Sequence, residues 1–209
     1  MGDQEPDFAD GMIRELEGRV RKLGLDSDAI EWRPVWWSHV LSEAQADLWR
    51  RSRRGNDLDY RKLRQFVVHS LGDAVAYRKV DPDELREGDV DTYSRVHEQI
   101  ERDMHALWQR TRAGKPASAR EVPLVVLAHS LGCHMISNYI WDRQKRGAPS
   151  RGNAFEDMKT LSGMITFGCN IPLFVLAHSR VEPIRFPINV KKYFPCLLYT
   201  SPSPRDRSL

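Results

Sequence analysis

The sequence predicts an α/β protein with a mostly parallel sheet covered by helices. The first observation is Val122–Leu127, a continuous aliphatic run with no polar alternation, which is typical of a strand covered on both faces. The second is the helical spacing of Met135, Ile136, Tyr139 and Ile140 directly after that run. The third is a series of helical patterns that separates this central strand from an earlier strand-like segment, Ala29–Trp37.

A serine lies between the predicted central strand and its helix. Ser130 has Ala128 two residues before it and Gly132 two residues after it, and a tight turn that carries a nucleophile requires small residues at both positions. This turn would lie at the carboxyl edge of the sheet, where open α/β folds bind ligands. It would also lie at a helix start, whose unpaired N–H groups stabilise a developing oxyanion, and the backbone N–H of Leu131 would be one such donor.

Two similar segments of the same chain serve as controls for this interpretation. His69–Gly72 repeats the His-Ser-Leu-Gly tetrapeptide, but the bulky Val68 precedes it where a small residue is needed. Ala177–Ser179 repeats Ala-His-Ser, but Val181 follows the serine at the other critical position. Ser130 is therefore the candidate nucleophile, and the alternative is a buried serine that caps a helix.

Two blocks of the chain resemble a known family. Val125–Asp142, with the sequence VVLAHSLGCHMISNYIWD, resembles the nucleophile elbow of the α/β-hydrolase superfamily on its lipase and esterase side, and most resembles a group of poorly characterised bacterial members. Met164–Leu173 resembles the next strand and loop of that group. The resemblance covers most of residues 1–195, although only these two blocks are specific, and it implies an α/β-hydrolase fold with an incomplete, mostly parallel sheet flanked by helices.

The remaining elements are expected as follows. Phe8–Leu23 is predicted as an amphipathic helix with Asp7 as its N-cap and Gly24 at its end. Three helices, about Ser38–Arg54, Leu58–Tyr77 and Val90–Ala113, are similar to the helical cap that such hydrolases insert, here over about residues 38–113. After the central helix we expect a short helix near Ala154–Leu161, a strand at Met164–Phe167, a helix at Ile171–Ala177 and irregular chain at Pro183–Pro195.

Both ends of the chain are interpreted as cut. Cys196–Asp206 back-translates to a sequence that resembles a transposon-based sequencing adapter, so residues 196–209 are interpreted as a non-native tail; the alternative is a natural Pro/Ser-rich disordered tail. Met1 and Gly2 resemble the end of the His-Gly-x-Gly loop that donates a second oxyanion N–H in this superfamily, unless Met1 is a true initiator. Residues 1–195 would then be a partial α/β-hydrolase domain that lacks a central strand, and we expect it to aggregate or stay partly unfolded.

The resemblance also sets where the partners of Ser130 should lie. The superfamily places the acid and then the histidine after later strands. Between Phe167 and residue 196 the only candidates are His178 and Glu182, in the wrong order. His129, His134, Asp73 and Asp142 are expected to be structural. The triad acid and histidine are therefore expected to be absent from this fragment, which would turn over little substrate.

The resemblance implies a serine hydrolase of carboxylic esters or thioesters that forms an acyl-enzyme on Ser130, with a small-molecule ester or acyl substrate and with neither cofactor nor metal. Two alternatives stay open. One is an acyltransferase that uses the same serine. The other is a non-catalytic α/β-hydrolase-fold binding module whose triad has decayed.

Composition limits the classes of partner. A formal net charge of +3 argues against a dominant electrostatic role with nucleic acid or anionic lipid, and the basic residues between Arg50 and Arg64 are interleaved with acidic ones and interpreted as a solvated helix face. The cysteines have no metal-ligand spacing and do not suggest a disulfide framework. No run approaches the ~20 apolar residues of a membrane span, and no signal peptide is recognisable, so a cytoplasmic location is the default expectation and the oligomeric state stays open.

Overall fold

A computed structural model describes residues 5–40, 50, 51, 60, 72, 74–84, 91–113, 122–145, 147–169, 171–175 and 182–187. The chain divides into two compact units, Met1–Gly114 and Lys115–Leu209, and each is described by itself. Within the described residues, no helix is both long and apolar enough to cross a membrane.

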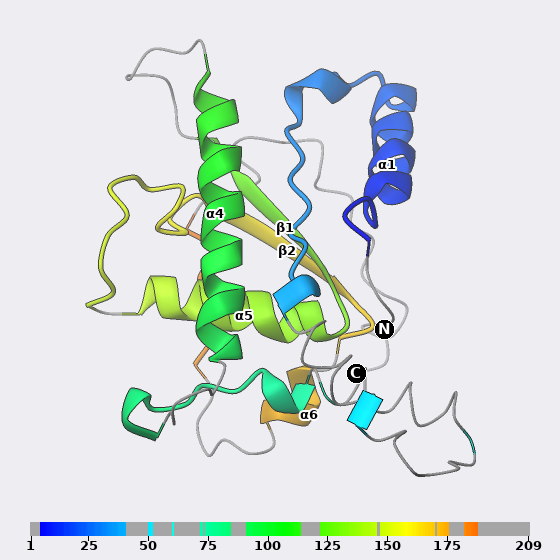
Figure 1. Cartoon of the computed structure of the whole chain (residues 1–209). Coiled ribbons are helices and arrows are strands. Elements are labelled where there is room, and N and C mark those ends of the chain that lie inside the picture. Colours follow the sequence, from blue (N-terminus) through cyan, green and yellow to red (C-terminus); the bar gives the residue numbers. More distant parts are fainter. Residues whose placement is uncertain are drawn as a thin grey trace, which may run out of the picture. The chain divides into compact units, whose positions relative to one another are not determined.

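The second unit contains the predicted strand, turn and helix. Strand β1 (Leu124–His129) leads into helix α5 (Leu131–Gln144), and strand β2 (Leu161–Phe167) is followed by the short helix α6 (Ile171–Val175). The two strands pair in parallel, with Leu127 beside Ile165 and His129 beside Phe167 (Figure 1). Each of these predicted elements is confirmed with shifted bounds, and β2 begins three residues earlier than expected.

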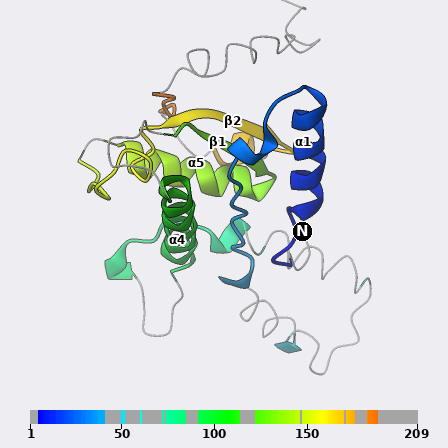
Figure 2. The same ribbon diagram turned by 90° about the horizontal axis from the view of Figure 1, so that it is seen from above.

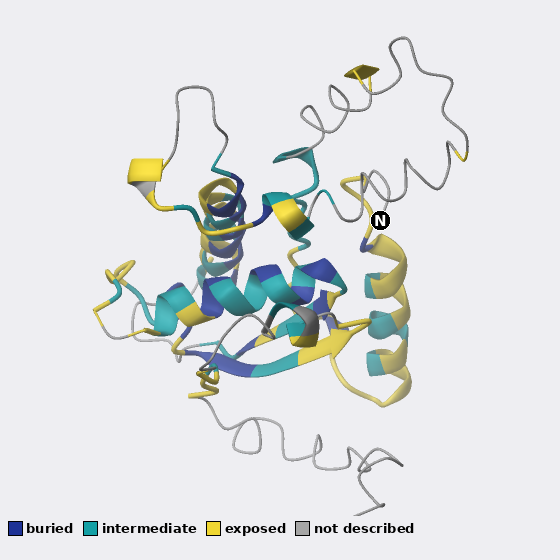
Figure 3. Cartoon of the chain, turned by 90° about the horizontal axis from the view of Figure 1, so that it is seen from below, coloured by how far each residue is buried: buried dark blue, intermediate teal, exposed yellow. Residues whose placement is uncertain are grey.

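Helix α5 runs along one face of the two-stranded sheet (Figure 2). Its fully buried side chains recur at helical spacing and form the core of the unit together with the start of β2 (Leu131, Cys133, Met135, Tyr139, Ile140 and Leu161). The other face of the sheet is more open, and burial falls along β2 from its buried start at Leu161 to the exposed Phe167 (Figure 3). Continuous burial was the expectation for the central strand, but Val125 on β1 is 44% exposed.

The short helix predicted near Ala154–Leu161 is wrong. Residues 154–160 form consecutive turns, and Leu161 already belongs to β2. Met158 adopts a positive φ of 56°, which ends a right-handed helix, and the Lys159 N–H reaches back to the Ala154 carbonyl at 2.8 Å. The buried carboxylate of Asp157 stabilises these turns, because it pairs with Arg143 of α5 at 2.9 Å and accepts hydrogen bonds from Ser150 and from the Arg151 N–H.

The first unit begins with helix α1 (Asp10–Lys22), where the sequence predicted it. Gly24 ends this helix as predicted, and its φ is +72°. The Gly24 N–H donates to the Arg21 carbonyl, and the Leu25 N–H donates to the Val20 carbonyl. These two bonds are those of a Schellman motif. Its start differs from the prediction, because Ala9 occupies the N-cap and no side chain caps the helix. Asp7 contributes only its backbone carbonyl, which accepts from the Asp10 N–H.

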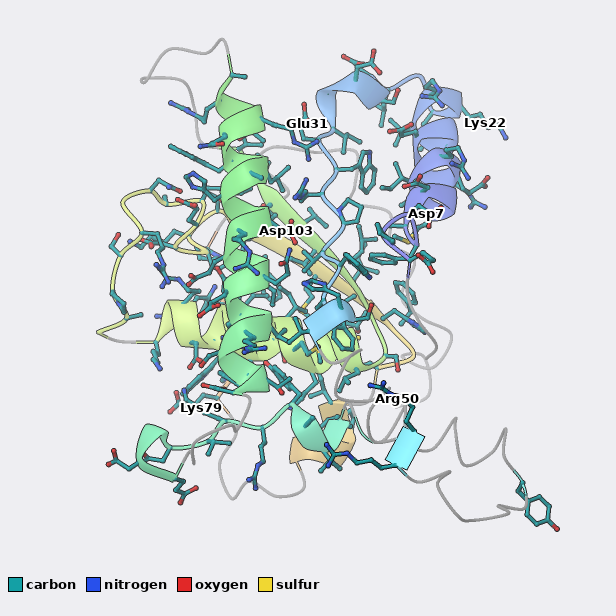
Figure 4. The ribbon with its side chains drawn as sticks, viewed as in Figure 1. Asp7, Lys22, Glu31, Arg50, Lys79 and Asp103 are labelled. Atoms are coloured by element: carbon teal, nitrogen blue, oxygen red, sulfur yellow. The ribbon has the colours of Figure 1, made fainter. Side chains whose placement is uncertain are left out.

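The strand predicted at Ala29–Trp37 is also wrong. Ala29 ends a 3₁₀ turn (η1, Ser27–Ala29), and residues 30–37 have no regular secondary structure. Side chains rather than a strand ladder fix this segment, because Arg33 forms a 2.6 Å ion pair with the buried Asp103 of helix α4 (Thr92–Arg112). Arg110 of α4 donates a hydrogen bond to the Trp32 carbonyl. Figure 4 labels Asp103 on the side of α4 nearest this segment. Strand propensity depends on a partner strand, and Trp32–Trp37 has α4 as its neighbour instead.

Helix α4 confirms the third helix of the predicted cap-like region. Asp91 caps it by accepting from the Ser94 N–H at 3.0 Å, and its buried residues recur every three or four positions (Tyr93, Val96, Ile100, Met104 and Leu107). Tyr77 stacks on Tyr93 and its hydroxyl lies 2.8 Å from His97 Nε2, while a short 3₁₀ turn (η2, Pro82–Glu84) precedes the helix. Most of the other two predicted helices, Ser38–Arg54 and Leu58–Tyr77, lies outside the described residues.

Candidate functional site

The backbone of Ser130 adopts a conformation that favours glycine. Its φ is 51° and its ψ is −124°, close to the first central position of a type II′ turn. A residue with a Cβ is disfavoured there, and such a conformation costs about 1–3 kcal/mol unless the surrounding structure imposes it. The sharp turn that the small-x-Ser-x-small pattern predicted is therefore present, and the serine itself carries the unusual torsion angles.

Hydrogen bonds on both sides of Ser130 hold this turn. Its N–H donates to the carbonyl of Phe167, the last residue of β2, at 3.0 Å. Its carbonyl accepts from the Cys133 N–H at 3.0 Å, which starts the first turn of α5. The parallel partner strand and the following helix thus fix the serine from two directions, and this explains how the disfavoured torsion angles persist.

The hydroxyl of Ser130 does not serve as a helix cap. Ser130 occupies the N-cap position of α5, yet its side chain makes no capping hydrogen bond. The residue as a whole is half-buried. The alternative of a structural capping serine therefore lacks the hydrogen bond that would define it.

The N–H of Leu131, the predicted oxyanion donor, lies at the start of α5. Leu131 is the first residue of α5 and is 1% exposed, and among the described residues its N–H has no backbone acceptor. The first N–H groups of a helix lack internal partners and carry its positive dipole end. Met1 and Gly2, the expected second oxyanion loop, lie outside the described residues.

The small residues around the turn play different parts from those expected. Ala128 is buried, as a tight turn requires. At Gly132, however, a Cβ would meet no atom of the described residues within 4 Å, so the expected crowding is absent there. The crowded glycine is Gly168, directly after β2, where φ is +54° and a Cβ would lie 3.1 Å from His129 Nε2. Sequence reasoning missed Gly168, and its position immediately after a predicted strand end was the available signal.

The histidines next to the serine have other contacts. The ring of His129 stacks on Phe167 with a centroid distance of 4.9 Å. The ring of His134 stacks on Phe174 of α6 at 4.0 Å and its Nε2 lies 3.3 Å from the Asn138 amide. That both histidines are structural stays a prediction.

The carboxylates considered as triad members also lie in other surroundings. Asp142 pairs with Lys145 at 3.0 Å on α5, and Glu182 is exposed. Among the described residues, no carboxylate or imidazole hydrogen-bonds to the Ser130 hydroxyl. His178, Asp73 and the control serine Ser70 lie outside the described residues.

No group of three or more histidine, cysteine, aspartate or glutamate side chains in the described part of the chain could hold a metal ion.

A comparison of the chain with models of protein families, with curated proteins and with solved structures finds no match.

Proposed function

We propose that the protein is a serine hydrolase of carboxylic esters or thioesters, of the α/β-hydrolase type, in which Ser130 forms an acyl-enzyme. The single observation that carries this proposal is the conformation of Ser130, with φ 51° and ψ −124° at the end of a parallel strand. Backbone strain of this kind concentrates at functional residues, and an N-cap serine whose hydroxyl does not cap the helix has no structural need for it. The resemblance of Val125–Asp142 to a nucleophile elbow supports the same conclusion.

The proposed reaction divides into two steps. In the first, Ser130 Oγ attacks the carbonyl carbon of the substrate while a base takes the hydroxyl proton. The acyl–oxygen or acyl–sulfur bond of the substrate then breaks, and the base returns the proton to the alcohol or thiol that leaves. The Leu131 N–H hydrogen-bonds to the oxyanion, and removal of one such donor typically lowers kcat by about 10²–10³. In the second step, water gives a proton to the base and attacks the acyl-enzyme; the bond to Ser130 Oγ breaks, the carboxylic acid leaves, and the base returns the proton to the serine. On the resemblance, the base is a histidine later in the chain order than Phe167, held by an acid.

Covalent labelling of the 209-residue chain with a fluorophosphonate probe tests the role of Ser130. We expect the probe to label Ser130, slowly in buffer and faster with added imidazole, which supplies an external base. Ser130→Ala should abolish the labelling. Ser137→Ala is the matched control, since Ser137 lies on the same helix with its hydroxyl bonded to the His134 carbonyl at 3.1 Å.

A second candidate is a non-catalytic binding module with the same fold. The observation that favours it is the lack of a carboxylate or imidazole on the Ser130 hydroxyl among the described residues. The labelling experiment separates the two. Labelling that is equally strong in Ser130→Ala, or absent even with imidazole, rejects the hydrolase and leaves the binding module.

A further inference from the structure

Two cysteines meet beside the candidate serine. Cys133 lies on the first turn of α5, and Cys169 lies two residues beyond the end of β2. The Cys133 sulfur is 3.3 Å from the Ala128 carbonyl and 3.9 Å from the Phe167 carbonyl, so it lies between the carboxyl ends of the two strands. Because Phe167 comes only two residues before Cys169, this position brings Cys133 near Cys169, and the two thiols interact. Both cysteines are free thiols.

The two thiols have opposite surroundings. Cys133 is fully buried, and burial together with the nearby Cys169 thiol raises its pKa to about 11. Cys169 is exposed. A thiolate is the reactive form of cysteine, so a soluble oxidant meets Cys169 first and Cys133 second. An exposed thiol with a second thiol beside it is the arrangement of a reactive cysteine and its resolving cysteine.

We propose that Cys133 and Cys169 form a reversible disulfide that links the first turn of α5 to the end of β2, next to Ser130. The oxidant is a small-molecule disulfide such as oxidised glutathione. The Cys169 thiolate attacks one of its sulfurs, an S–S bond forms to Cys169, and one small thiolate leaves. Cys133 then loses its proton to solvent base and attacks the Cys169 sulfur, which releases the second small thiolate. Two protein thiols are oxidised and one disulfide is reduced to two thiols.

The capped intermediate helps the second attack. Once Cys169 carries the small thiol, it no longer bears a thiolate charge next to Cys133, so one cause of the raised Cys133 pKa disappears. The resulting bond closes the chain from residue 133 to residue 169, which includes most of α5 and all of β2. A cross-link over such a loop restricts the unfolded chain and raises thermal stability.

The test is oxidation of the 209-residue chain with a glutathione redox buffer, followed by alkylation and peptide mapping without reduction. We expect the native chain to yield the Cys133–Cys169 linked peptide as the dominant pairing, with the Tm shifted upward and restored by reductant. Oxidation of the chain in guanidinium is the reference, because there the three cysteines, Cys196 included, pair without native guidance.

Single substitutions separate the outcomes. Cys196→Ser should leave the linked peptide unchanged. Cys133→Ser should stop the reaction at a glutathione adduct on Cys169, and Cys169→Ser should leave Cys133 reduced. The proposal is overturned if native and denatured chains give the same mixture of pairings, if Cys169 pairs with Cys196, or if wild-type Cys169 retains the glutathione adduct. The readouts do not depend on Ser130 chemistry, so the result stands apart from the proposed hydrolase.

Discussion

At the scale of single residues, Ser130 combines a proposed chemical role with a conformational cost. Its φ of 51° lies where glycine is comfortable and a residue with a Cβ is not. Strained residues of this kind cluster at functional sites, and the strain lowers the stability of the fold. A substitution that removes the Cβ should therefore separate stability from the proposed activity.

We expect Ser130→Gly to be more stable than Ser130→Ala by about 1 kcal/mol, because only glycine adopts this φ without strain. Ser137 provides the control, since it lies within α5 at an ordinary helical position, where Gly is about 1 kcal/mol less stable than Ala. Urea unfolding of the four variants gives both differences. The strain interpretation fails if the Gly–Ala difference has the same sign at 130 and at 137.

The two glycines near the serine give a second pair of substitutions. Gly168→Ala should destabilise the chain by more than about 1 kcal/mol, because its φ is +54° and the new Cβ would lie 3.1 Å from His129 Nε2. Gly132→Ala should be neutral or stabilising by up to about 1 kcal/mol, because Gly132 lies on a helix and a Cβ there would meet no atom of the described residues within 4 Å. Thermal unfolding measures both variants. If Gly132→Ala is destabilised, the requirement for a small residue that the sequence predicts at position 132 holds after all.

At the scale of elements, the segment between α5 and β2 depends on one buried carboxylate. Asp157 and Arg143 are each almost fully buried, and their ion pair joins these turns to the helix. Burial opposes ionisation of Asp157, but the Arg151 N–H, the Ser150 hydroxyl and Lys159 together outweigh it and hold the pKa of Asp157 well below its ordinary value. We therefore expect acid to weaken the connection between α5 and β2.

We expect stability to fall as pH drops below about 4, the ordinary range of an aspartate pKa. The unfolded chain takes up a proton at Asp157 before the folded chain does, so protonation favours unfolding, and the contribution is complete above that range. Asp157→Asn should cost about 3–5 kcal/mol at neutral pH, because it leaves Arg143 buried and unpaired, and should flatten the acid dependence.

Asp142→Asn is the control for this prediction. Asp142 pairs with the partly exposed Lys145 on the same helix, and such a pair contributes only about 0.2–0.5 kcal/mol. Urea unfolding at several pH values measures both variants. Equal losses for Asp142→Asn and Asp157→Asn would contradict the role assigned to the buried pair.

The elements that could be predicted share one property, which is that their sequence signal is local. The apolar run predicts β1, the apolar side chains at helical spacing predict α5, and the glycine after α1 predicts the end of that helix. Trp32–Trp37 has the composition of a strand, but its partner is Asp103 on α4, some seventy positions away in the chain, and composition carries no record of that ion pair. Residues 154–160 differ from the predicted helix for a similar reason. The Asp157 side chain bonds to Arg143, Ser150 and the Arg151 N–H, and these contacts hold the segment in turns.

The candidate site also has a part that the sequence predicts and a part that it does not predict. The turn at Ser130 follows from a pentapeptide pattern, and the same pattern predicts the N–H of Leu131 as an oxyanion donor. The meeting of Cys133 with Cys169, and of Gly168 with His129, depends on the parallel register of β1 and β2, which sequence spacing does not reveal. The strand register therefore determines the part of the site that sequence reasoning could not reach.

At the scale of the whole molecule, one face of the sheet is apolar and exposed. Ile165 and Phe167 are two residues apart on β2 and so share a face, and the register places Val125 of β1 on that face. All three are more than 40% exposed. Within the described residues the sheet has only two strands, so each strand has an edge without a strand partner there. An apolar strand with an open edge favours pairing between molecules.

We expect the 209-residue chain to self-associate through this face, with an apparent mass in sedimentation velocity that rises with concentration. Ile165→Lys should weaken the association, because it introduces a charge at the centre of the exposed face. Leu23→Lys is the control: Leu23 is 75% exposed at the end of α1 and belongs to no strand, and its replacement should leave the association unchanged. If both variants behave alike, general hydrophobicity drives the association and the sheet has no special part in it.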